Sequence, residues 1–515
     1  MRSTFMGLET ARRGMFTQQS ALHTTGHNIS NANTPGYTRQ RINFEQTEPY
    51  PNASLNRPQI PGQVGTGVKA GSIQRVRESF LDIQYRSENN KLGYWETRAE
   101  AYTKLEEVLN EPSESGLAKT MDQFWQSLQD LAVNPTNPGA RSVVRQRGIA
   151  VAETFNYLHN SLSSIQRDLK NEVSVTEKEI NSLTYQISKI NGQIADVEPH
   201  GYLPNDLYDE RDRLIDQLAS LVNIKVDYTN SGGGSLKMAD GQAVIKMVSD
   251  SGKELGILVS GDRNNNLTVN FDGADESVKT LSIGDSKFNF TELNSTGKLK
   301  ALVDSYGYEA NGKVAGVYPE MITELDNLAF TFATEFNNVH KEGMSPNDIA
   351  NKTKAGNAFF ADSENADLQR KGFASRIQLA DAINQSLDNI ATADGSDIAN
   401  ATIGDSTNIL KLANIINDKF DYAGDNEQAN FRNYYEGVIG GMAVKSQEAV
   451  RLTQNSGSLR ESVENRRKSV SSVSLDEEMT NMIQFQHAYN ASARMITLQD
   501  EMLDKIINGM GTVGR

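Results

Sequence analysis

The fold is decided by residues 474–508, SLDEEMTNMIQFQHAYNASARMITLQDEMLDKIIN, in which apolar side chains recur at every seventh position. This spacing keeps one face of a helix turned toward a partner helix. The opening Ser-Leu-Asp-Glu predicts that the helix is capped by the Ser474 hydroxyl, with Glu477 reaching back, and acids in the first turn suit the helix dipole. The residues of this C-terminal seam are Leu475, Met482, Tyr489, Ile496, Leu503 and Met510.

The N-terminal end of the chain repeats the pattern in a weaker form, at Met1, Leu8, Met15, Leu22 and Ile29. The predicted helix also contains three glycines, at positions 7, 14 and 26, and each costs about 1 kcal/mol relative to Ala. A helix this weak orders only on a partner. We therefore expect both ends of the chain to be mobile in the isolated molecule and helical in an assembly. The simpler alternative is two ordinary amphipathic helices that pack on a globular body.

The first helix is predicted to end in a tight turn formed by Asn33, Thr34, Pro35, Gly36 and Tyr37. Pro35 suits the second position of a type II turn, and Gly36 suits the third position, which requires a positive φ. Prolines at positions 49, 51, 58 and 61 follow. They predict an extended loop or ribbon that leads into a strand at residues 68–76.

The middle of the chain alternates between helical and strand patterns. Helical periodicity covers residues 80–109, 117–131, 139–190 and 318–339, and a long helix is expected from residue 431 to the end. Short alternating runs between glycine turns predict a small β-rich domain at residues 225–302. The predicted fold class is mainly α, with terminal helices forming a coiled-coil-like rod, an α-helical domain and projecting β-rich and mixed domains. The predicted domains are a terminal coiled-coil assembly segment (1–45 with 470–515), an α-helical rod domain (46–224 with 303–345 and 426–469), the β-rich domain and a mixed domain (346–425).

The charge and composition exclude several classes of function. The 515 residues include 51 Lys and Arg against 66 Asp and Glu, so the net charge of −15 disfavours nucleic acid and anionic membranes as partners. Cysteine is absent, which removes disulfides, thiolate metal sites and cysteine nucleophiles. No apolar run is long enough to span a membrane, and residues 1–29 lack the apolar core of a signal peptide.

No motif predicts catalysis, a cofactor or a metal site. His23 and His27 have a spacing that zinc enzymes use, but no Glu follows His23 to act as a base. The glycines at residues 62–67 resemble a phosphate loop, but Val68 stands between Gly67 and Lys69. There is no Gly-x-Ser-x-Gly nucleophile elbow. We expect a protein that is not an enzyme and that takes no cofactor.

Two segments at opposite ends of the chain resemble one protein family. NISNANTPGY (residues 28–37) is similar to the N-terminal motif of the bacterial flagellar rod, hook and hook-associated proteins, and SLDEEMTNMIQFQHAYNASAR (residues 474–494) is similar to their C-terminal motif. The chain is longer than a rod protein, and Thr38, Arg39 and Gln40 directly follow the first motif. These features favour a junction protein between hook and filament. Another axial protein, either hook protein or the second junction protein, is the alternative.

The resemblance implies a structural axial subunit that is needed for filament attachment. It implies secretion through the flagellar type III apparatus, without cleavage, to an extracellular position in the flagellum. The implied partners are further copies of the chain in a ring or helical oligomer, hook protein, the second hook-associated junction protein and a flagellar export chaperone that binds the C-terminal helix. The predicted assembly residues are Leu8, Met15, Leu22, Ile29, Leu475, Met482, Tyr489, Ile496 and Leu503.

Overall fold

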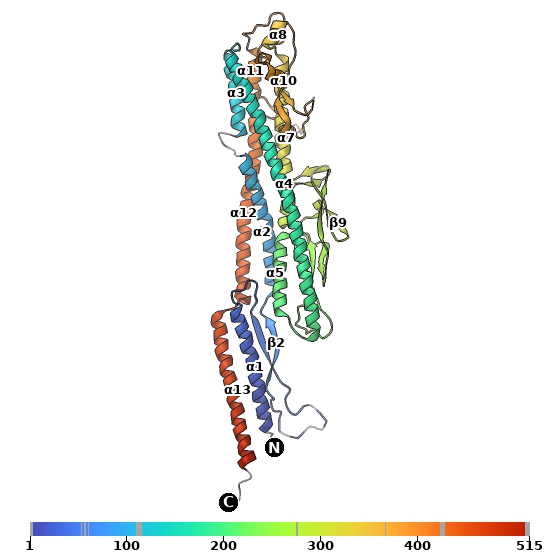
Figure 1. Cartoon of the computed structure of the whole chain (residues 1–515), viewed down its shortest axis with the longest axis vertical. Helices are drawn as coiled ribbons and strands as arrows, with labels where there is room; N and C mark the ends of the chain where they lie inside the picture. The colour runs from blue at the N-terminus through green and yellow to red at the C-terminus, as the bar shows by residue number, and fades with distance from the viewer. Residues whose placement is uncertain are drawn as a thin grey trace. The chain divides into compact units, whose positions relative to one another are not determined.

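The computed structural model describes residues 4–52, 54–55, 58–59, 61–109, 116–273, 277–365, 367–422 and 428–509 (Figure 1). The chain divides into two compact units. Unit 1 comprises Met1–Asn90, Ile180–Asn266 and Gly457–Arg515, and unit 2 comprises Lys91–Glu179 and Leu267–Ser456. The four-part division drawn from the sequence stays a prediction.

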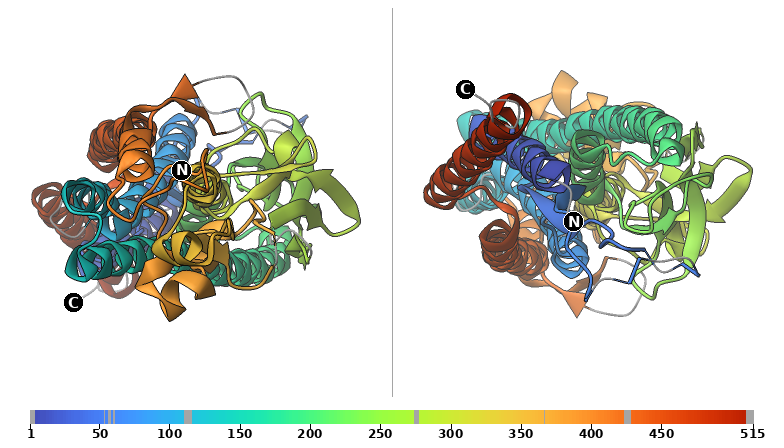
Figure 2. Two further views of the ribbon diagram at one scale, coloured as in Figure 1. Left: turned by 90° about the horizontal axis from the view of Figure 1, so that it is seen from above. Right: turned by 90° about the horizontal axis from the view of Figure 1, so that it is seen from below.

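Unit 1 contains both terminal helices. The helices α1 (Thr4–Ser30) and α13 (Leu475–Gly509) lie side by side in Figure 1 and in the right-hand view of Figure 2. An antiparallel ribbon of β1 (Gln40–Gln46) and β2 (Val68–Arg75) contacts α1, and its pairing shifts between Asn43 and Phe44. The unit also holds α5 (Asn205–Leu221) and the 3-10 helix η1 (Glu198–His200). Its remaining helical residues come from the start of α2 (Ser79–Leu109), the end of α4 (Pro138–Val197) and the end of α12 (Phe431–Ser471).

A four-stranded antiparallel sheet of unit 1 packs near the end of α4. Its order is β3 (Ile224–Thr229), β4 (Gln242–Val248), β5 (Glu254–Ser260) and β6 (Arg263–Asn264). The buried Asn191 of α4 donates to the backbone oxygens of Ala243 and Gly261, at distances of 2.8 Å and 2.9 Å. Because these carbonyls would otherwise lack partners in the interior, the side chain ties helix and sheet together.

Unit 2 combines helices with small sheets. Its sheet of β7 (Leu267–Asp272), β8 (Ser277–Ile283), β9 (Ser286–Asn289), β10 (Tyr308–Ala310) and β11 (Lys313–Ala315) is mostly antiparallel, with one parallel pairing between β10 and β8. Two further antiparallel pairs are β12 (Phe360–Asp362) with β13 (Ile377–Leu379) and β14 (Phe420–Asp421) with β15 (Gln428–Ala429). The helices that lie wholly in this unit are α3 (Leu117–Val133), α6 (Lys298–Tyr306), α7 (Val317–Glu342), α8 (Pro346–Asn351), α9 (Phe373–Arg376), α10 (Asp381–Gln385) and α11 (Thr407–Asn414), with the 3-10 helices η2 (Phe290–Glu292), η3 (Leu387–Asn389) and η4 (Ile415–Asn417).

The core of unit 2 is aromatic. Phe124 of α3 packs against Phe336 of α7 with ring centroids 5.3 Å apart, and Phe336 packs against Phe359 at 5.0 Å. Phe332 lies 5.0 Å from Phe360 in the same cluster. Offset and edge-on ring pairs of this kind stabilise a core beyond simple burial. The cluster therefore joins α3, α7 and the segment around β12.

The predicted fold class, mainly α with small sheets in the middle and long terminal helices, is confirmed. Two helices are additions, because α5 lies in a stretch where no separate helix was expected and α6 occupies the end of the predicted β-rich segment. The single long helix expected from residue 431 onward is wrong. The helix α12 ends at Ser471, whose carbonyl accepts a 2.9 Å hydrogen bond from the Arg39 amide. The next helix, α13, begins at Leu475.

Candidate functional site

The helices α1 and α13 pair in an antiparallel sense. A Cβ atom on Gly7 would lie 3.0 Å from the Gln499 side-chain nitrogen, and one on Gly14 would lie 3.1 Å from the Ser492 hydroxyl. Near the other end of α1, Asn28 donates to Glu478. Residue numbers thus rise along one helix as they fall along the other. The glycines that weaken α1 in isolation let the two backbones approach closely.

The predicted apolar seams flank this line of contact. Leu475 is 49% exposed, so the α13 seam begins on the surface of the unit. Met1 and Met510 lie outside the described residues. The other members are half-buried, namely Leu8, Met15, Leu22 and Ile29 on α1 and Met482, Tyr489, Ile496 and Leu503 on α13. Their part in assembly stays a prediction.

The turn after α1 has the predicted geometry. Gly36 has a φ of 84°, and the Tyr37 amide donates to the Thr34 carbonyl at 3.2 Å, which closes the turn. Asn33 and Pro35 are exposed. Tyr37 is half-buried, and its hydroxyl donates to the Asn28 side-chain oxygen at 2.8 Å. Burial raises the pKa of Tyr37, which therefore stays protonated as a donor.

Replacing Gly36 with Val should impair the assembly that the resemblance implies more than it lowers the stability of unit 2. A β-branched residue at positive φ costs about 1–3 kcal/mol, and the strain falls on the turn that orients Tyr37. Gly36→Asn is the matched control because Asn tolerates this conformation. Because the resemblance implies a place in flagella, swimming in soft agar and the amount of the chain in purified flagella measure the effect. Normal assembly of the Val variant would contradict the role of the turn.

Asn28 is the centre of a hydrogen-bonded cluster that we call the terminal clasp, formed by Asn28, Tyr37, Arg39, Gln40 and Glu478. The Asn28 amide nitrogen donates to the Gln40 carbonyl at 2.8 Å and to the Glu478 carboxylate at 3.1 Å. Its oxygen accepts from the Gln40 amide at 2.9 Å, as well as from Tyr37. Asn28 is 1% exposed and Glu478 2% exposed. A buried amide with all of these partners fixes α1, β1 and α13 at one point.

Arg39 closes the terminal clasp from the side of the ribbon. Its Nε donates to Glu478 at 2.8 Å and its Nη1 to Glu477 at 2.7 Å. Among the described contacts, the Glu477 carboxylate binds Arg39 rather than the Ser474 amide. The capping role predicted for Glu477 is therefore wrong. Since Glu478 is buried and bonded to both Arg39 and Asn28, its charge is compensated by hydrogen bonds as well as by the guanidinium.

The helix α5 anchors the same segment. The Thr38 amide donates to Asp209 at 2.9 Å, and the Gln40 side chain donates to Asp206 at 2.9 Å. Asn205 donates to the Ile73 carbonyl of β2 at 3.0 Å. The residues that follow the N-terminal motif are thus held by α5 on one side and by α13 on the other.

Next to these contacts lies a buried cluster of arginines and aspartates. Asp212 accepts ion pairs from Arg75 at 3.0 Å, Arg77 at 3.1 Å and Arg86 at 3.4 Å. The neighbouring carboxylate of Asp216 pairs with Arg86 at 2.7 Å and with Arg467 of α12 at 2.5 Å. We call this set the Arg–Asp cluster; its members are Arg75, Arg77, Arg86, Arg467, Asp82, Asp209, Asp212 and Asp216.

The arginines control the ionisation of this cluster. Burial alone would raise the pKa of Asp212, but Arg77 and Arg75 outweigh burial and hold that pKa well below its usual range. Burial raises the pKa of Asp209, which Arg75 offsets only in part. The cluster thus binds β2, α2, α5 and α12 through charge pairs whose loss would leave buried ions.

A groove of about 570 Å³ opens beside the terminal clasp. Its walls come from α1, β1 and α13, and its residues include Ala21, Thr25, Ile42, Phe44 and Phe485. Phe44 and Phe485 meet edge to face with ring centroids 6.0 Å apart. The groove is therefore a mixed cavity with aromatic walls and a polar end at Glu478 and Arg39.

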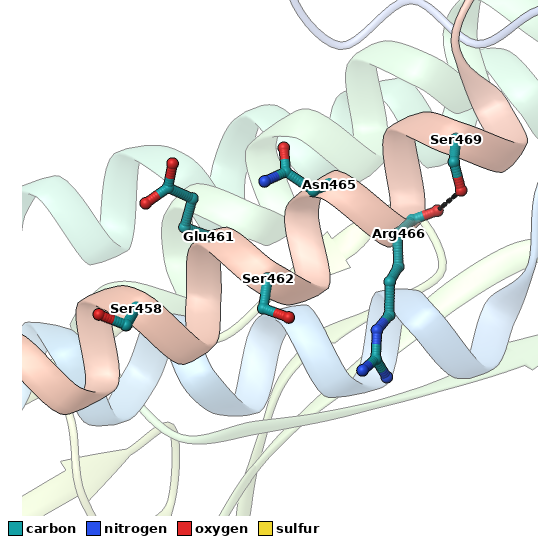
Figure 3. Close-up of a pocket in the computed structure, with 6 residues that line it drawn as sticks. All are labelled: Ser458, Glu461, Ser462, Asn465, Arg466 and Ser469. Atoms are coloured by element: carbon teal, nitrogen blue, oxygen red, sulfur yellow. Dashed lines mark hydrogen bonds between the residues drawn. The ribbon is translucent and has the colours of Figure 1, made fainter.

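A second, shallower hollow follows one face of α12 in unit 1 (Figure 3). Ser458, Ser462, Asn465 and Ser469 recur along this face, with Glu461 and Arg466 between them. The Ser469 hydroxyl donates to the Arg466 carbonyl at 2.7 Å, so it is satisfied within its own helix. The hollow is an exposed polar surface and holds no convergent set of reactive groups.

The described residues contain no cluster of three His, Asp or Glu side chains placed to bind a metal ion. His27, one of the two histidines at zinc-like spacing, contacts the Tyr37 hydroxyl through Nδ1 at 3.0 Å. None of the described helices combines the length and apolarity needed to cross a membrane.

Of the terminal clasp, sequence reasoning named Tyr37 as a site residue and missed Asn28, Arg39, Gln40 and Glu478. Asn28 and Glu478 stand inside the two motifs, and Arg39 stands directly after the first, so the motifs themselves were the available signal. The Arg–Asp cluster had no such signal, because its members are spread from Arg75 to Arg467.

Family models match both ends and the middle of the chain. Residues 8–38 match the model described as flagella basal body rod protein, and residues 469–509 match the C-terminal model of the flagellar basal body rod FlgEFG proteins. These two segments contain most of α1, the turn, α13 and three of the five residues of the terminal clasp. They define the class of protein as a flagellar rod and hook type of structural component.

The rest of the chain narrows this class. Residues 102–360 match the helical domain of flagellar hook-associated protein FlgK. The chain is 46% identical to flagellar hook-associated protein 1 of Bacillus subtilis (strain 168) over 521 residues, covering 100% of both chains. It belongs to the family of flagellar hook-associated protein 1.

A more distant relative and a solved structure are consistent with this family. Flagellar hook-associated protein 1 of Escherichia coli (strain K12) is 23% identical over 572 residues, covering 97% of this chain and 99% of that protein. The solved structure of the flagellar hook junction protein FlgK from Burkholderia pseudomallei shares the fold, with a TM-score of 0.59 and 14% identity, over 75% of this chain and 100% of that one. The family predicted from the two end motifs is thereby confirmed.

Proposed function

We propose that the chain is a structural subunit of the junction between the flagellar hook and filament, and that filament attachment requires it. The observation that carries this proposal is the surface of α13, which keeps large apolar side chains exposed although the helix is paired with α1. Exposed apolar surface of this extent marks a protein–protein contact. The exposed residues are Met479, Ile483, Met495, Leu498, Met502 and Ile506.

The terminal clasp supports the same proposal. It joins the N- and C-terminal motifs within one subunit, so that α1 and α13 present a single preformed surface to neighbours. Preorganising a surface lowers the entropy lost on binding. The partners that we propose are further copies of the chain, hook protein on one side and the second hook-associated junction protein on the other.

A strain that lacks this chain provides the direct test. Electron microscopy should show hooks without filaments, and the filament subunit should accumulate in the medium. Restoring the gene should restore the filaments. Full-length filaments on the deletion strain would overturn the proposal.

We propose further that the chain is exported before it assembles. A chaperone would cover the C-terminal seam until export. A bare apolar helix face would promote aggregation unless a partner held it. That partner must also be released, so its affinity is moderate. The same seam would then serve the chaperone first and neighbouring subunits afterwards.

Replacing Ile496 and Leu503 together with Asp should abolish both contacts. Two charges in a desolvated seam cost several kcal/mol in either complex. Pull-down of the chaperone and electron microscopy of the flagella measure the two effects. Thr497→Asp with Lys505→Asp, at exposed neighbouring positions, is the matched control. Normal chaperone binding by the seam variant, with failed assembly, would show that the chaperone recognises another part of the chain.

A further inference from the structure

We propose that residues 387–393 of unit 2 form an acid-sensitive latch, which the neutral imidazole of His340 holds on helix α7 and which opens when that ring takes up a second proton. We call residues 387–393 the latch segment. The inference goes beyond the proposed function, because it concerns a conformational change within one subunit and does not depend on the place of the chain in the flagellum.

The imidazole of His340 lies between two backbone groups. It belongs to the last turn of α7 and is 2% exposed. Its Nδ1 lies 2.8 Å from the Asn357 carbonyl oxygen, and its Nε2 lies 3.1 Å from the amide nitrogen of Ala391 in the latch segment. Because a carbonyl only accepts and a backbone N–H only donates, Nδ1 carries the proton and Nε2 accepts. The two backbone partners thus fix the neutral ring in one tautomer.

A second proton on His340 would go to Nε2, the atom that accepts from Ala391. Two donors would then face each other in the interior, and the Ala391 amide would lose its acceptor. Burial lowers the pKa of His340 to about 4, whereas a solvated histidine has a pKa of about 6.5. As the pH falls, the open form of the latch therefore takes up this proton before the closed form does.

The charged groups around His340 do not offset its burial. Asp348 of α8 favours the protonated ring, but its carboxylate already accepts hydrogen bonds from two backbone amides and a hydroxyl. Lys341 opposes protonation, and the buried Arg141 of α4 places a second cation on the latch segment, where it donates to the Ile390 carbonyl at 2.9 Å. The remaining ring contacts of the imidazole are to two phenylalanines, which are uncharged.

The other described contacts of the latch segment do not respond to mild acid. Met344 and Ala393 exchange two backbone hydrogen bonds, at 2.9 Å and 3.1 Å, and the Asn408 side chain donates to the Ala391 carbonyl at 3.2 Å. The helices α7, α8 and α11 and the 3-10 helix η3 meet around this segment (Figure 1). Backbone groups, amides and a guanidinium keep their charge between pH 5 and pH 7.5, so the response in this range comes from His340.

The two pKa values set the size of the effect. With a pKa of about 4 in the closed form and about 6.5 in the open form, the ratio of open to closed molecules rises about fourfold from pH 7.5 to pH 6 and about thirtyfold from pH 7.5 to pH 5. An Asp carboxyl, with an ordinary pKa of about 3.9, contributes little above pH 5. This range is therefore separate from the more acidic one in which Asp212 acts.

Hydrogen exchange of the full chain, read by mass spectrometry, tests the latch. The protection factor of peptides from the latch segment, which is the intrinsic exchange rate at each pH divided by the measured rate, should fall about thirtyfold from pH 7.5 to pH 5. Peptides from the β3–β6 sheet of unit 1 are the internal reference and should change little. An unchanged latch segment, or an equal fall in the reference sheet, would overturn the inference.

A pair of variants assigns the effect to one ring. His340→Gln cannot take up a proton, so the protection factor of its latch segment, whatever its size, should be the same at pH 7.5 and pH 5. His159→Gln is the matched control, because His159 is a half-buried histidine of the same unit that lies on α4 beside Asp326. The control should keep the thirtyfold fall. A fall of the same size in the His340→Gln chain would overturn the inference.

Discussion

A chain in which Glu478 is replaced by Ala should lose filament attachment and should open at its C-terminal helix. The substitution leaves the buried Asn28 amide and the Arg39 guanidinium without their shared acceptor. Breaking a buried ion pair from one side costs about 3–5 kcal/mol. Because 1.4 kcal/mol is a factor of ten, the open population of α13 should rise by about a hundredfold or more.

The rate of tryptic cleavage at the exposed Arg494 measures this opening, and swimming in soft agar measures the loss of function. The adjacent residue supplies the control. Glu477 also binds Arg39, but its side chain is 63% exposed, and exposed ion pairs contribute about 1 kcal/mol or less. The Glu477→Ala chain should therefore be cleaved at nearly the same rate as the unmodified chain, and cells that carry it should swim nearly as well. Equal behaviour of the two variants would contradict the role of the terminal clasp.

Replacing Asp212 with Ala should have a comparable effect on unit 1. Arg75, Arg77 and Arg86 all lie within 3.4 Å of this carboxylate, and the substitution leaves three buried cations with fewer counter-charges. The expected loss of stability is about 3–5 kcal/mol, seen as a lower midpoint of urea unfolding. Asp196→Ala, at an exposed position on α4, should change the midpoint little.

The same carboxylate predicts the pH dependence of unit 1. Its pKa in the folded chain lies well below the value of about 3.9 for an unfolded Asp, so the unfolded state binds protons first as the pH falls. The stabilisation is complete at pH values well above 3.9 and is lost progressively below it. Asp212→Ala should remove much of this acid sensitivity, and an unchanged acid unfolding profile would contradict the assignment.

The elements that could be predicted from the sequence are those with a repeating apolar pattern or a specific turn. The seven-residue spacing predicted α1 and α13, and Pro35 with Gly36 predicted a turn whose glycine has positive φ. Their pairing line could not be predicted from apolar residues, because it passes along Gly7, Gly14 and Ser492. Small and polar side chains carry almost no hydrophobic signal.

The polar sites were harder to predict from the sequence than the helix pairing. Asn28 and Glu478 are 450 positions apart, and nothing in the local sequence of either residue reveals its partner. The ion pairs of Asp212 join α5 to arginines that are far from it in the sequence, such as Arg75. Charge pairs between distant parts of the chain therefore could not be predicted from the sequence. Helices with a local apolar periodicity could be predicted.

The small residues along α1 have a consequence for the register of the two terminal helices. Gly7, Gly14 and Ala21 are spaced by seven, so sliding α13 by two turns would again place small α1 residues along the line of contact. Helix contacts of this kind are degenerate under a shift. The Asn28 amide breaks the degeneracy, because only one alignment places the Glu478 carboxylate 3.1 Å from it. One polar pair near the end of α1 thus selects a single alignment from several that shape alone would allow.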